Sequence, residues 1–479
     1  MSTLRIPTEE IEFHPTSFCD RAGRLFSWKG ELYRGITKHR ASVLKKFLDD
    51  GSAQGLVDKG LIDTELTEFA VDGYEIVVKH RRVPFVSYAS EWCPEMVKDA
   101  ALCVADLEIE LTRIGLTLSD ADPWNVLFDG CRPVYVDFSN IRPVAWDPDR
   151  SWRQLRDQLY NCFVYPLVLM SQGYGHLARL LLTNREYGVI QSEFAALMGY
   201  RGPGSETNEA APSFLSVATR CIPRPINSIA KKGIKLFNAA LSRSYSGNYQ
   251  ARRDAVQQLR QELERIPMPE DFATTTTDDE NSCLPLAPSD RWTQKHHAAY
   301  KVLSDLRPSS VLDIGSGQAW YSQLAASLGS NVVALDMNDQ LVARCYREAK
   351  SKNLPILPLV MNIRFPSPGY GLCNKEVAPA FQRLQCDMVL ALGLVHLLVF
   401  KYYVPFEQIV ETLATFARRW LLVEFISRED GEVRNLWWDW LSWYTLDQFQ
   451  AVLGRYFNNI TILPSHPQRR ILLLCEKSG

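Results

Sequence analysis

The C-terminal part of the chain, from about residue 289, alternates short apolar runs with amphipathic stretches. Apolar runs of about four to eight residues predict buried strands, and amphipathic stretches predict helices. We expect strands at 310–314, 331–336, 355–361, 386–392, 420–425, 460–464 and 470–476, with helices at 321–328 and 340–351. This alternation indicates an α/β fold with a doubly wound, mostly parallel sheet, closed by an antiparallel pair formed by the last two runs.

The N-terminal part has a different order of elements. Strand-like pieces come first, at 23–36, 74–80 and 83–89, with a helix at about 39–50 among them. A helix at 94–114, a hairpin with strands at 126–128 and 134–138, and a mostly helical remainder follow. This order predicts a two-lobed α+β domain, with a small β-rich lobe at about 10–90 and a helical lobe at about 91–266.

A linker is predicted between these parts at 267–288. The stretch contains four consecutive threonines, an acidic run and several prolines, and it has no apolar periodicity. We therefore expect one domain at 1–266 and another at 289–479. Just before the linker, the segment 224–265 is rich in Lys and Arg with apolar residues at helical spacing, which is typical of a solvated helix face.

Composition and charge limit the partners and the cellular compartment that the sequence allows. The formal net charge is −2, so no global field would attract the chain to nucleic acid or to an anionic membrane. The eleven cysteines include no C-x-x-C pair, which favours reduced thiols in a cytoplasm over a disulfide framework or a zinc site. The longest largely apolar run, 388–400, is shorter than the roughly 20 residues of a membrane span. We expect a cytoplasmic protein with no nucleic-acid partner and no membrane span.

A D-x-G-x-G pattern lies between a predicted strand and a predicted helix in VLDIGSGQAWYS. Gly315 and Gly317 would let a bulky ligand approach the backbone at the carboxyl end of the strand. Asp336 ends the next strand, 23 positions after Asp313, where a carboxylate can accept hydrogen bonds from both hydroxyls of a ribose. A dinucleotide fingerprint requires a small residue at the position of Trp320. The pattern therefore resembles the S-adenosylmethionine (SAM) loop of class I methyltransferases, and the alternative is a structural glycine turn in another α/β fold.

Further positions would complete a SAM pocket. Asn362 follows the third strand and could bond the adenine amino group, while Met337 and Leu392, at the ends of the second and fourth strands, would border the cofactor. His396 lies just beyond the fourth strand, where an imidazole could take the proton from a hydroxyl acceptor. The alternative for His396 is a half-buried histidine bonded to backbone. Glu424, on the fifth strand, is a second candidate for a base or a substrate contact.

The first domain contains a kinase-like spacing in LSDADPWNVLFDGCRPVYVDF. Asp120 precedes Asn125 by five positions, and Asp137 follows Asn125 by twelve. In kinases the first Asp orients the attacking hydroxyl, while the Asn and the later Asp hold magnesium beside ATP. Arg34 stands nearest to the position of the kinase lysine.

The same domain also departs from kinases. It has no G-x-G-x-x-G loop and no V-A-I-K lysine, and Ser119 precedes the candidate catalytic Asp. Three interpretations stay open: phosphotransfer with ATP and magnesium, nucleotide or acceptor binding without transfer, and a structural turn built from Asp, Pro and Gly.

Four tryptophans and a tyrosine crowd the segment NLWWDWLSWYTLDQF at 435–449. Such density indicates an acceptor lid or a packed insertion helix. Contact with a membrane surface is the least favoured alternative, because Asp439 and Asp447 interrupt the aromatic run.

The chain as a whole resembles bacterial class I methyltransferases that are similar to nodulation host-specificity proteins. Besides the motifs above, the resemblance runs through VPFVSYASEW, LPLVMNIRFPSP, ALGLVHLLVFKYYVP and VEFISRED. The family usually has a second histidine where this chain has Leu397, which leaves His396 alone. The resemblance implies a Rossmann-like seven-stranded methyltransferase domain after a protein-kinase-like domain, and methyl transfer from SAM.

We therefore predict a bacterial SAM-dependent methyltransferase of the EC 2.1.1 type. Its acceptor would be a small molecule or a sugar-type compound, within a biosynthetic pathway. The alternatives are phosphotransfer or nucleotide binding by the kinase-like domain, and a non-catalytic scaffold.

Overall fold

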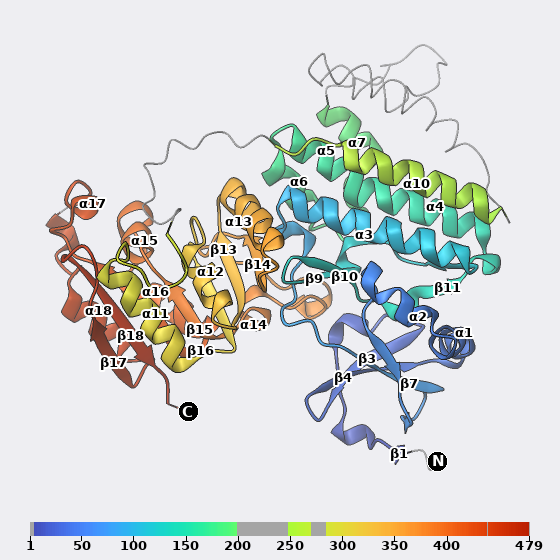
Figure 1. The fold of residues 1–479 in the computed structure, drawn as a ribbon, viewed down its shortest axis with the longest axis horizontal. Helices are drawn as coiled ribbons and strands as arrows, with labels where there is room; N and C mark the ends of the chain where they lie inside the picture. The colour runs from blue at the N-terminus through green and yellow to red at the C-terminus, as the bar shows by residue number, and fades with distance from the viewer. Residues whose placement is uncertain (1–3, 199–247, 270–283, 438, 479) are drawn as a thin grey trace. The chain divides into compact units, whose positions relative to one another are not determined.

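The computed structural model describes residues 4–198, 248–269, 284–437 and 439–478, and its ribbon is drawn in Figure 1. Most of the predicted linker, and the part of the basic segment before residue 248, lie outside these residues. The chain divides into two compact units. Unit 1 comprises Met1–Arg82, Tyr88–Leu127 and Pro133–Glu270, and unit 2 comprises Val83–Ser87, Phe128–Arg132 and Asp271–Gly479. Within the described ranges, no helix is both long and apolar enough to cross a membrane.

A seven-stranded sheet forms the core of unit 2, in the order β14-β13-β12-β15-β16-β18-β17. The strands are β12 (Ser310–Ile314), β13 (Asn331–Asp336), β14 (Ile356–Val360), β15 (Cys386–Ala391), β16 (Ala417–Ile426), β17 (Asn459–Leu463) and β18 (Arg470–Glu476). Strands β14, β13, β12, β15 and β16 run parallel to one another, and β18 pairs antiparallel with both β16 and β17. The mixed α/β architecture expected from the sequence is confirmed.

Helices cover this sheet because its central strands are mostly apolar and are buried on both faces. Every residue of β12 is buried, so both faces of the sheet need a cover. Helix α12 packs against β12 and β13, α13 against β13 and β14, and α16 against β15 and β16. The helices are α11 (Gln294–Leu306), α12 (Trp320–Ser327), α13 (Asp339–Ser351), α14 (Ala380–Arg383), α15 (Val395–Tyr402), α16 (Phe406–Phe416), α17 (Gly431–Arg434) and α18 (Leu446–Leu453).

The strand order of unit 2 reverses at β12. The next strand in sequence, β13, lies on one side of β12, whereas β15 lies on the other. In open α/β sheets the loops after two such strands leave in opposite directions, which opens a crevice at their carboxyl ends. The turn that contains Gly315 follows β12 and the turn that contains Gly393 follows β15, so both turns lie at the carboxyl ends of adjacent strands where the order reverses.

Unit 1 begins with a five-stranded antiparallel sheet in the order β2-β3-β4-β7-β5. Its strands are β2 (Glu12–Phe13), β3 (Gly23–Trp28), β4 (Glu31–Ile36), β5 (Thr64–Leu66) and β7 (Ile76–His80), and a short parallel pair joins β1 (Leu4–Arg5) to β6 (Phe69–Ala70). Lys29 and Gly30 connect β3 to β4, and both have positive φ, as a tight two-residue hairpin turn requires. Helix α1 (Lys38–Asp49) packs against β5 and β7 and is followed by the short α2 (Ser52–Gly55).

The strand predicted at 83–89 is wrong. The segment forms no strand and leads into a 3-10 turn at Ala89–Glu91. Pro84 has no N–H to donate to a neighbouring strand, which weakens any ladder there. Conversely, the short antiparallel pair β8 (Leu116–Leu118) and β11 (Ile141–Pro143) was not predicted.

The rest of unit 1 is mainly helical. Its described helices are α3 (Pro94–Arg113), α4 (Pro148–Leu159), α5 (Tyr165–Ser171), α6 (Gly175–Leu181), α7 (Gln191–Leu197) and α10 (Tyr249–Arg265). The paired strands β9 (Val126–Asp129) and β10 (Arg132–Tyr135) belong to it in part, because Phe128–Arg132 is assigned to unit 2. Helix α10 packs along α3, and Arg252 of α10 lies 2.9 Å from Glu108 of α3 with both side chains buried. The basic segment therefore supplies a buried ion pair as well as a solvated face.

Candidate functional site

The turn after β12 exposes its backbone. Gly315 and Gly317 have φ of +75° and +54°, in the left-handed region that favours glycine. A Cβ on Gly317 would meet no protein atom within 4 Å, and one on Gly315 would only touch Leu394 at 3.5 Å. Both glycines therefore give a ligand direct access to the main chain.

Asp336, at the end of β13, faces this turn. Its Oδ2 accepts the N–H of Gly317 at 3.0 Å and its Oδ1 accepts the N–H of Asn338 at 2.9 Å. Burial raises the pKa of Asp336, and these backbone donors oppose the rise. Met337 follows with its side chain largely exposed, next to the carboxylate in sequence.

Asp313 has a different environment from Asp336. Its side chain is buried and accepts the hydroxyl of Ser322, in helix α12, at 2.6 Å. Burial raises its pKa to about 6. Asp313 thus links strand β12 to helix α12, the two elements that the glycine turn connects. In this position it supports the candidate cofactor site from within the core.

Two other predicted pocket residues follow neighbouring strands. Asn362 comes shortly after β14, and its Oδ1 accepts the N–H of Arg364 at 3.0 Å. Leu392 directly follows β15 and is half-buried. Because β14, β13, β12 and β15 are consecutive in the parallel part of the sheet, the residues at their carboxyl ends share one edge.

His396 lies in the first turn of α15 and is buried. Its Nε2 is 3.1 Å from Oε2 of Glu432, while its Nδ1 has no hydrogen-bond partner in the described structure. Burial lowers the pKa of His396, and Glu432 opposes that effect. The carboxylate favours the tautomer that holds the proton on Nε2, which leaves a bare lone pair on Nδ1. The predicted alternative, a histidine bonded to backbone, does not match these contacts.

Glu424, on β16, forms an ion pair that the sequence did not reveal. Its Oε2 lies 2.8 Å from Nζ of Lys295 on α11, and its side chain is fully buried. A Cβ on Gly393 would come within 3.9 Å of the same oxygen, so the pair sits beside the turn after β15. Sequence reasoning missed Lys295 because no motif links it to Glu424 across 129 positions.

Most of the described aromatic residues at 435–449 pack inward. Tyr444 is buried, stacks on Phe425 and donates its hydroxyl to the carbonyl of Ile426 at 2.9 Å. Trp440 is instead exposed and lies beside the exposed ring of Tyr403, with ring centres 5.8 Å apart. Trp438 lies outside the described residues.

In unit 1 the structure joins two of the kinase-like candidates. Nη1 of the buried Arg34 lies 3.0 Å from Oδ1 of Asp137 and 2.7 Å from Oδ2 of Asp20. The second oxygen of Asp137 accepts the side-chain amide of Asn140. The two oxygens that would bind magnesium are therefore both engaged by protein donors.

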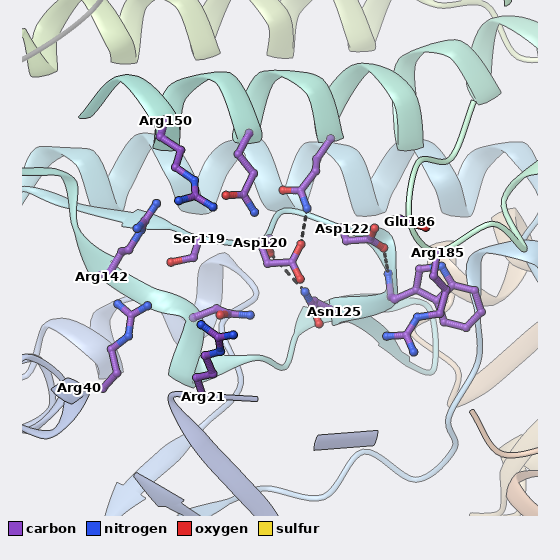
Figure 2. A pocket seen from close by; sticks show the side chains of 14 residues that line it. Arg21, Arg40, Ser119, Asp120, Asp122, Asn125, Arg142, Arg150, Arg185 and Glu186 are labelled. Atoms are coloured by element: carbon purple, nitrogen blue, oxygen red, sulfur yellow. Dashed lines mark hydrogen bonds between the residues drawn. The ribbon is translucent and has the colours of Figure 1, made fainter. Parts of the chain in front are cut away.

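Asp120 and Asn125 line a cavity in the same unit (Figure 2). The Asn125 amide donates to the backbone carbonyl of Asp120 at 3.3 Å, and the Gln158 amide donates to the Asp120 carboxylate. Asn125 thus braces the loop that carries Asp120. Among the described residues, no group of three or more His, Cys, Asp or Glu side chains is arranged to hold a metal ion.

Comparison with known proteins finds similarity to several solved structures and to one curated protein. Solved structures similar to this chain include the bifunctional kinase-methyltransferase WbdD, at 18% identity and a TM-score of 0.28, with 37% of each chain covered. They also include the SAM-bound magnesium protoporphyrin IX methyltransferase ChlM from Synechocystis PCC 6803, at 15% identity and a TM-score of 0.26, with 38% of this chain and 76% of ChlM covered. The chain therefore spans well under half of the length of WbdD.

Nodulation protein NoeA of Rhizobium meliloti (strain 1021) is 22% identical to this chain over 444 residues, which is 88% of this chain and 86% of NoeA. The predicted resemblance to nodulation proteins is thereby confirmed over most of the chain. No protein-family model matches it.

Proposed function

We propose that unit 2 is a SAM-dependent methyltransferase. When bound, SAM supplies an electrophilic methyl group on its sulfonium. The observation that supports this proposal most strongly is the open glycine turn after β12 with the Asp336 carboxylate beside it. Substitution of either glycine by a larger residue would fill or strain the surface that the ligand needs.

The residues around the turn fit an adenosyl ligand. The two oxygens of Asp336 accept backbone N–H groups and still have lone pairs free, so the carboxylate can bind the ribose hydroxyls. Oδ1 of Asn362 likewise retains a lone pair beside its bond to Arg364, which suits the adenine amino group. Met337 and Leu392 would supply apolar contact.

His396 is our candidate for the base. The Glu432 carboxylate would hold the imidazole by its Nε2–H. Nδ1, which is buried in the free protein, would accept the proton of an acceptor hydroxyl once acceptor binding gives access to it. This arrangement is chemically that of a histidine oriented by a carboxylate. Because the Glu424 carboxylate is already paired with Lys295, we assign it the role of fixing that ammonium beside the Gly393 turn.

We further propose a small-molecule or sugar-type acceptor and a biosynthetic role in the cytoplasm. The exposed pair of Trp440 and Tyr403 supports a ring-shaped acceptor, because aromatic faces stack on sugar or planar rings. Catalysis would then depend mainly on alignment of the acceptor with the methyl donor.

Calorimetric titration with S-adenosylhomocysteine tests the cofactor assignment. We expect Asp336→Ala and Gly315→Val to lose binding, and Asp305→Ala, which removes an exposed carboxylate from α11, to bind like the parent. Retained binding in both site variants would reject the pocket. Loss of methyl transfer in His396→Gln with normal cofactor binding would then identify the base separately.

A further inference from the structure

Unit 1 contains a cavity of about 550 Å³ next to Asp120 that is rich in arginine. Five arginines and three carboxylates line it, which gives a formal charge of +2. The arginines are Arg21, Arg40, Arg142, Arg150 and Arg185. This volume is typical of sites for small organic ligands, and is more than a single ion fills.

Four of these arginines gather at one end of the cavity. Figure 2 shows Arg21, Arg40, Arg142 and Arg150 directed toward the space beside Ser119, while Asp122, Glu186 and Arg185 lie toward the other end. The four come from separate parts of the chain: the segment before β3, helix α1, strand β11 and helix α4. The fold therefore collects the positive charge, and no sequence run of basic residues accounts for it.

None of the four clustered guanidinium groups pairs directly with a carboxylate in the described part of the chain; Arg40 and Arg142 are half-buried, and Arg21 and Arg150 are exposed. Within the described residues, the buried atoms Nη1 of Arg40, Nε of Arg142 and Oγ of Ser119 have no hydrogen-bond partner. Burial, and then the charge of Arg142, lower the pKa of Arg40 against the opposing charges of Asp20 and Asp137. Burial also lowers the pKa of Arg142, and Asp147 opposes that effect. Buried donors without acceptors and like charges side by side both destabilise a folded protein. Such a cluster indicates a missing anionic ligand.

The neighbouring carboxylates offset the charge of this cluster only in part. Asp147, whose Oδ1 accepts the backbone N–H of Arg150 at 3.2 Å, opposes the fall in the pKa of Arg142. Asp137 and Asp20 are paired with Arg34, and the Asp120 carboxylate accepts the Gln158 amide. Burial, and then the charge of Asp120, raise the pKa of Asp122 to about 7, which weakens its negative charge near neutral pH. Since both oxygens of Asp137 already have donors, a metal ion would have to displace Arg34 and Asn140 to reach them.

We propose that this cavity binds the phosphate groups of a phosphorylated small molecule directly through its arginines, without magnesium. Guanidinium groups form forked, charge-assisted hydrogen bonds that match phosphate oxygens, and several of them together suit a group that carries two or more negative charges. The Ser119 hydroxyl would donate a further bond to the same group. The site is separate from the proposed methyltransferase pocket, because all its residues belong to unit 1.

Titration of the full chain with inorganic pyrophosphate in EDTA tests the proposal. We expect the parent to bind and to gain thermal stability, and Arg142→Gln and Arg40→Gln each to weaken binding by roughly tenfold or more, as loss of a charge-assisted bond implies. Arg153→Gln is the matched control, since Arg153 is exposed on α4 and does not line the cavity.

The stability of the free variants separates a binding role from a structural one. If the arginines exist for a ligand, Arg142→Gln relieves repulsion and leaves the melting temperature without pyrophosphate unchanged or higher. A lowered melting temperature with unchanged pyrophosphate affinity would reject the proposal. Binding that requires magnesium, or no binding by the folded parent, would reject it as well. Parallel titrations with ADP and with glucose 1-phosphate then show whether a nucleotide or a sugar presents the phosphate.

Discussion

The N–H of Gly317 donates to the carboxylate of Asp336 at 3.0 Å, so one hydrogen bond joins the turn after β12 to the end of β13. This bond fixes the carboxylate beside a turn whose own atoms leave space open. Stability and ligand binding at this turn can therefore be separated by experiment.

Gly317→Ala should reduce binding more than stability. The left-handed φ of +54° costs an alanine about 1 kcal/mol, and a methyl group there would enter the open space that a ligand needs. We expect a modest decrease in the free energy of unfolding and a large loss of S-adenosylhomocysteine affinity. Gly329→Ala is the control, because Gly329 also has positive φ and open surroundings but lies at the other end of the sheet. Equal effects of both substitutions on affinity would contradict the assignment.

His80 should make the parent sensitive to acid. Burial, with a smaller effect of Arg34, lowers its pKa to about 3 from an ordinary value near 6.5. Between these values the unfolded chain binds a proton that the folded chain does not, so stability is complete above about pH 6.5 and falls as the pH decreases.

At pH 5 this difference amounts to about 2 kcal/mol. Urea unfolding of His80→Gln should therefore show a weaker loss of stability between pH 7 and pH 5 than the parent shows. The exposed His39→Gln should behave like the parent. Identical pH profiles for His80→Gln and the parent would show that His80 titrates normally.

Two ion pairs between α3 and α10 should differ sharply in their effect on stability. Arg252 and Glu108 are almost fully buried, whereas Arg260 and Asp106 are about one-third exposed. Removal of one partner from a buried pair leaves a charge without compensation, so Arg252→Met should cost about 3–5 kcal/mol in unfolding free energy. Arg260→Met should cost less than about 1 kcal/mol. Similar losses for both variants in chemical denaturation would refute this ranking.

The aromatic segment should contain one residue needed for folding and one that is not. Tyr444→Ala should destabilise unit 2 by about 3–5 kcal/mol, because the ring is buried against Phe425. Trp440→Ala should change stability by less than about 0.5 kcal/mol, since its ring is mostly exposed. Thermal unfolding of both variants distinguishes them, and a large loss for Trp440→Ala would remove it as an acceptor contact.

Long apolar runs made much of unit 2 predictable. The strands at 310–314, 331–336 and 470–476 begin and end where the sequence indicated, because each run is mostly apolar and has polar or charged residues at or next to its ends. The strand expected at 83–89 failed because local composition does not show whether a partner strand is present. Pieces as short as Leu116–Leu118 carry too few residues for a periodic signal.

The candidate site residues likewise divide into those that the sequence predicted and those that it did not. Gly315, Gly317 and Asp336 were found because the chemistry is encoded in one local pattern and the strand that follows it. Lys295 and the clustered arginines were missed because their relationships exist only after distant segments have folded together. Spacing alone also suggested a magnesium site at Asp137, whereas the structure places Arg34 on it.

The buried pair of Lys295 and Glu424 constrains how this chain can evolve. A single substitution at either position leaves the opposite charge buried without a partner. Selection should therefore remove variants that carry only one of the two changes. Relatives that replace the lysine with a neutral residue should therefore have lost the acid as well, and the two positions should covary in an alignment of homologous chains.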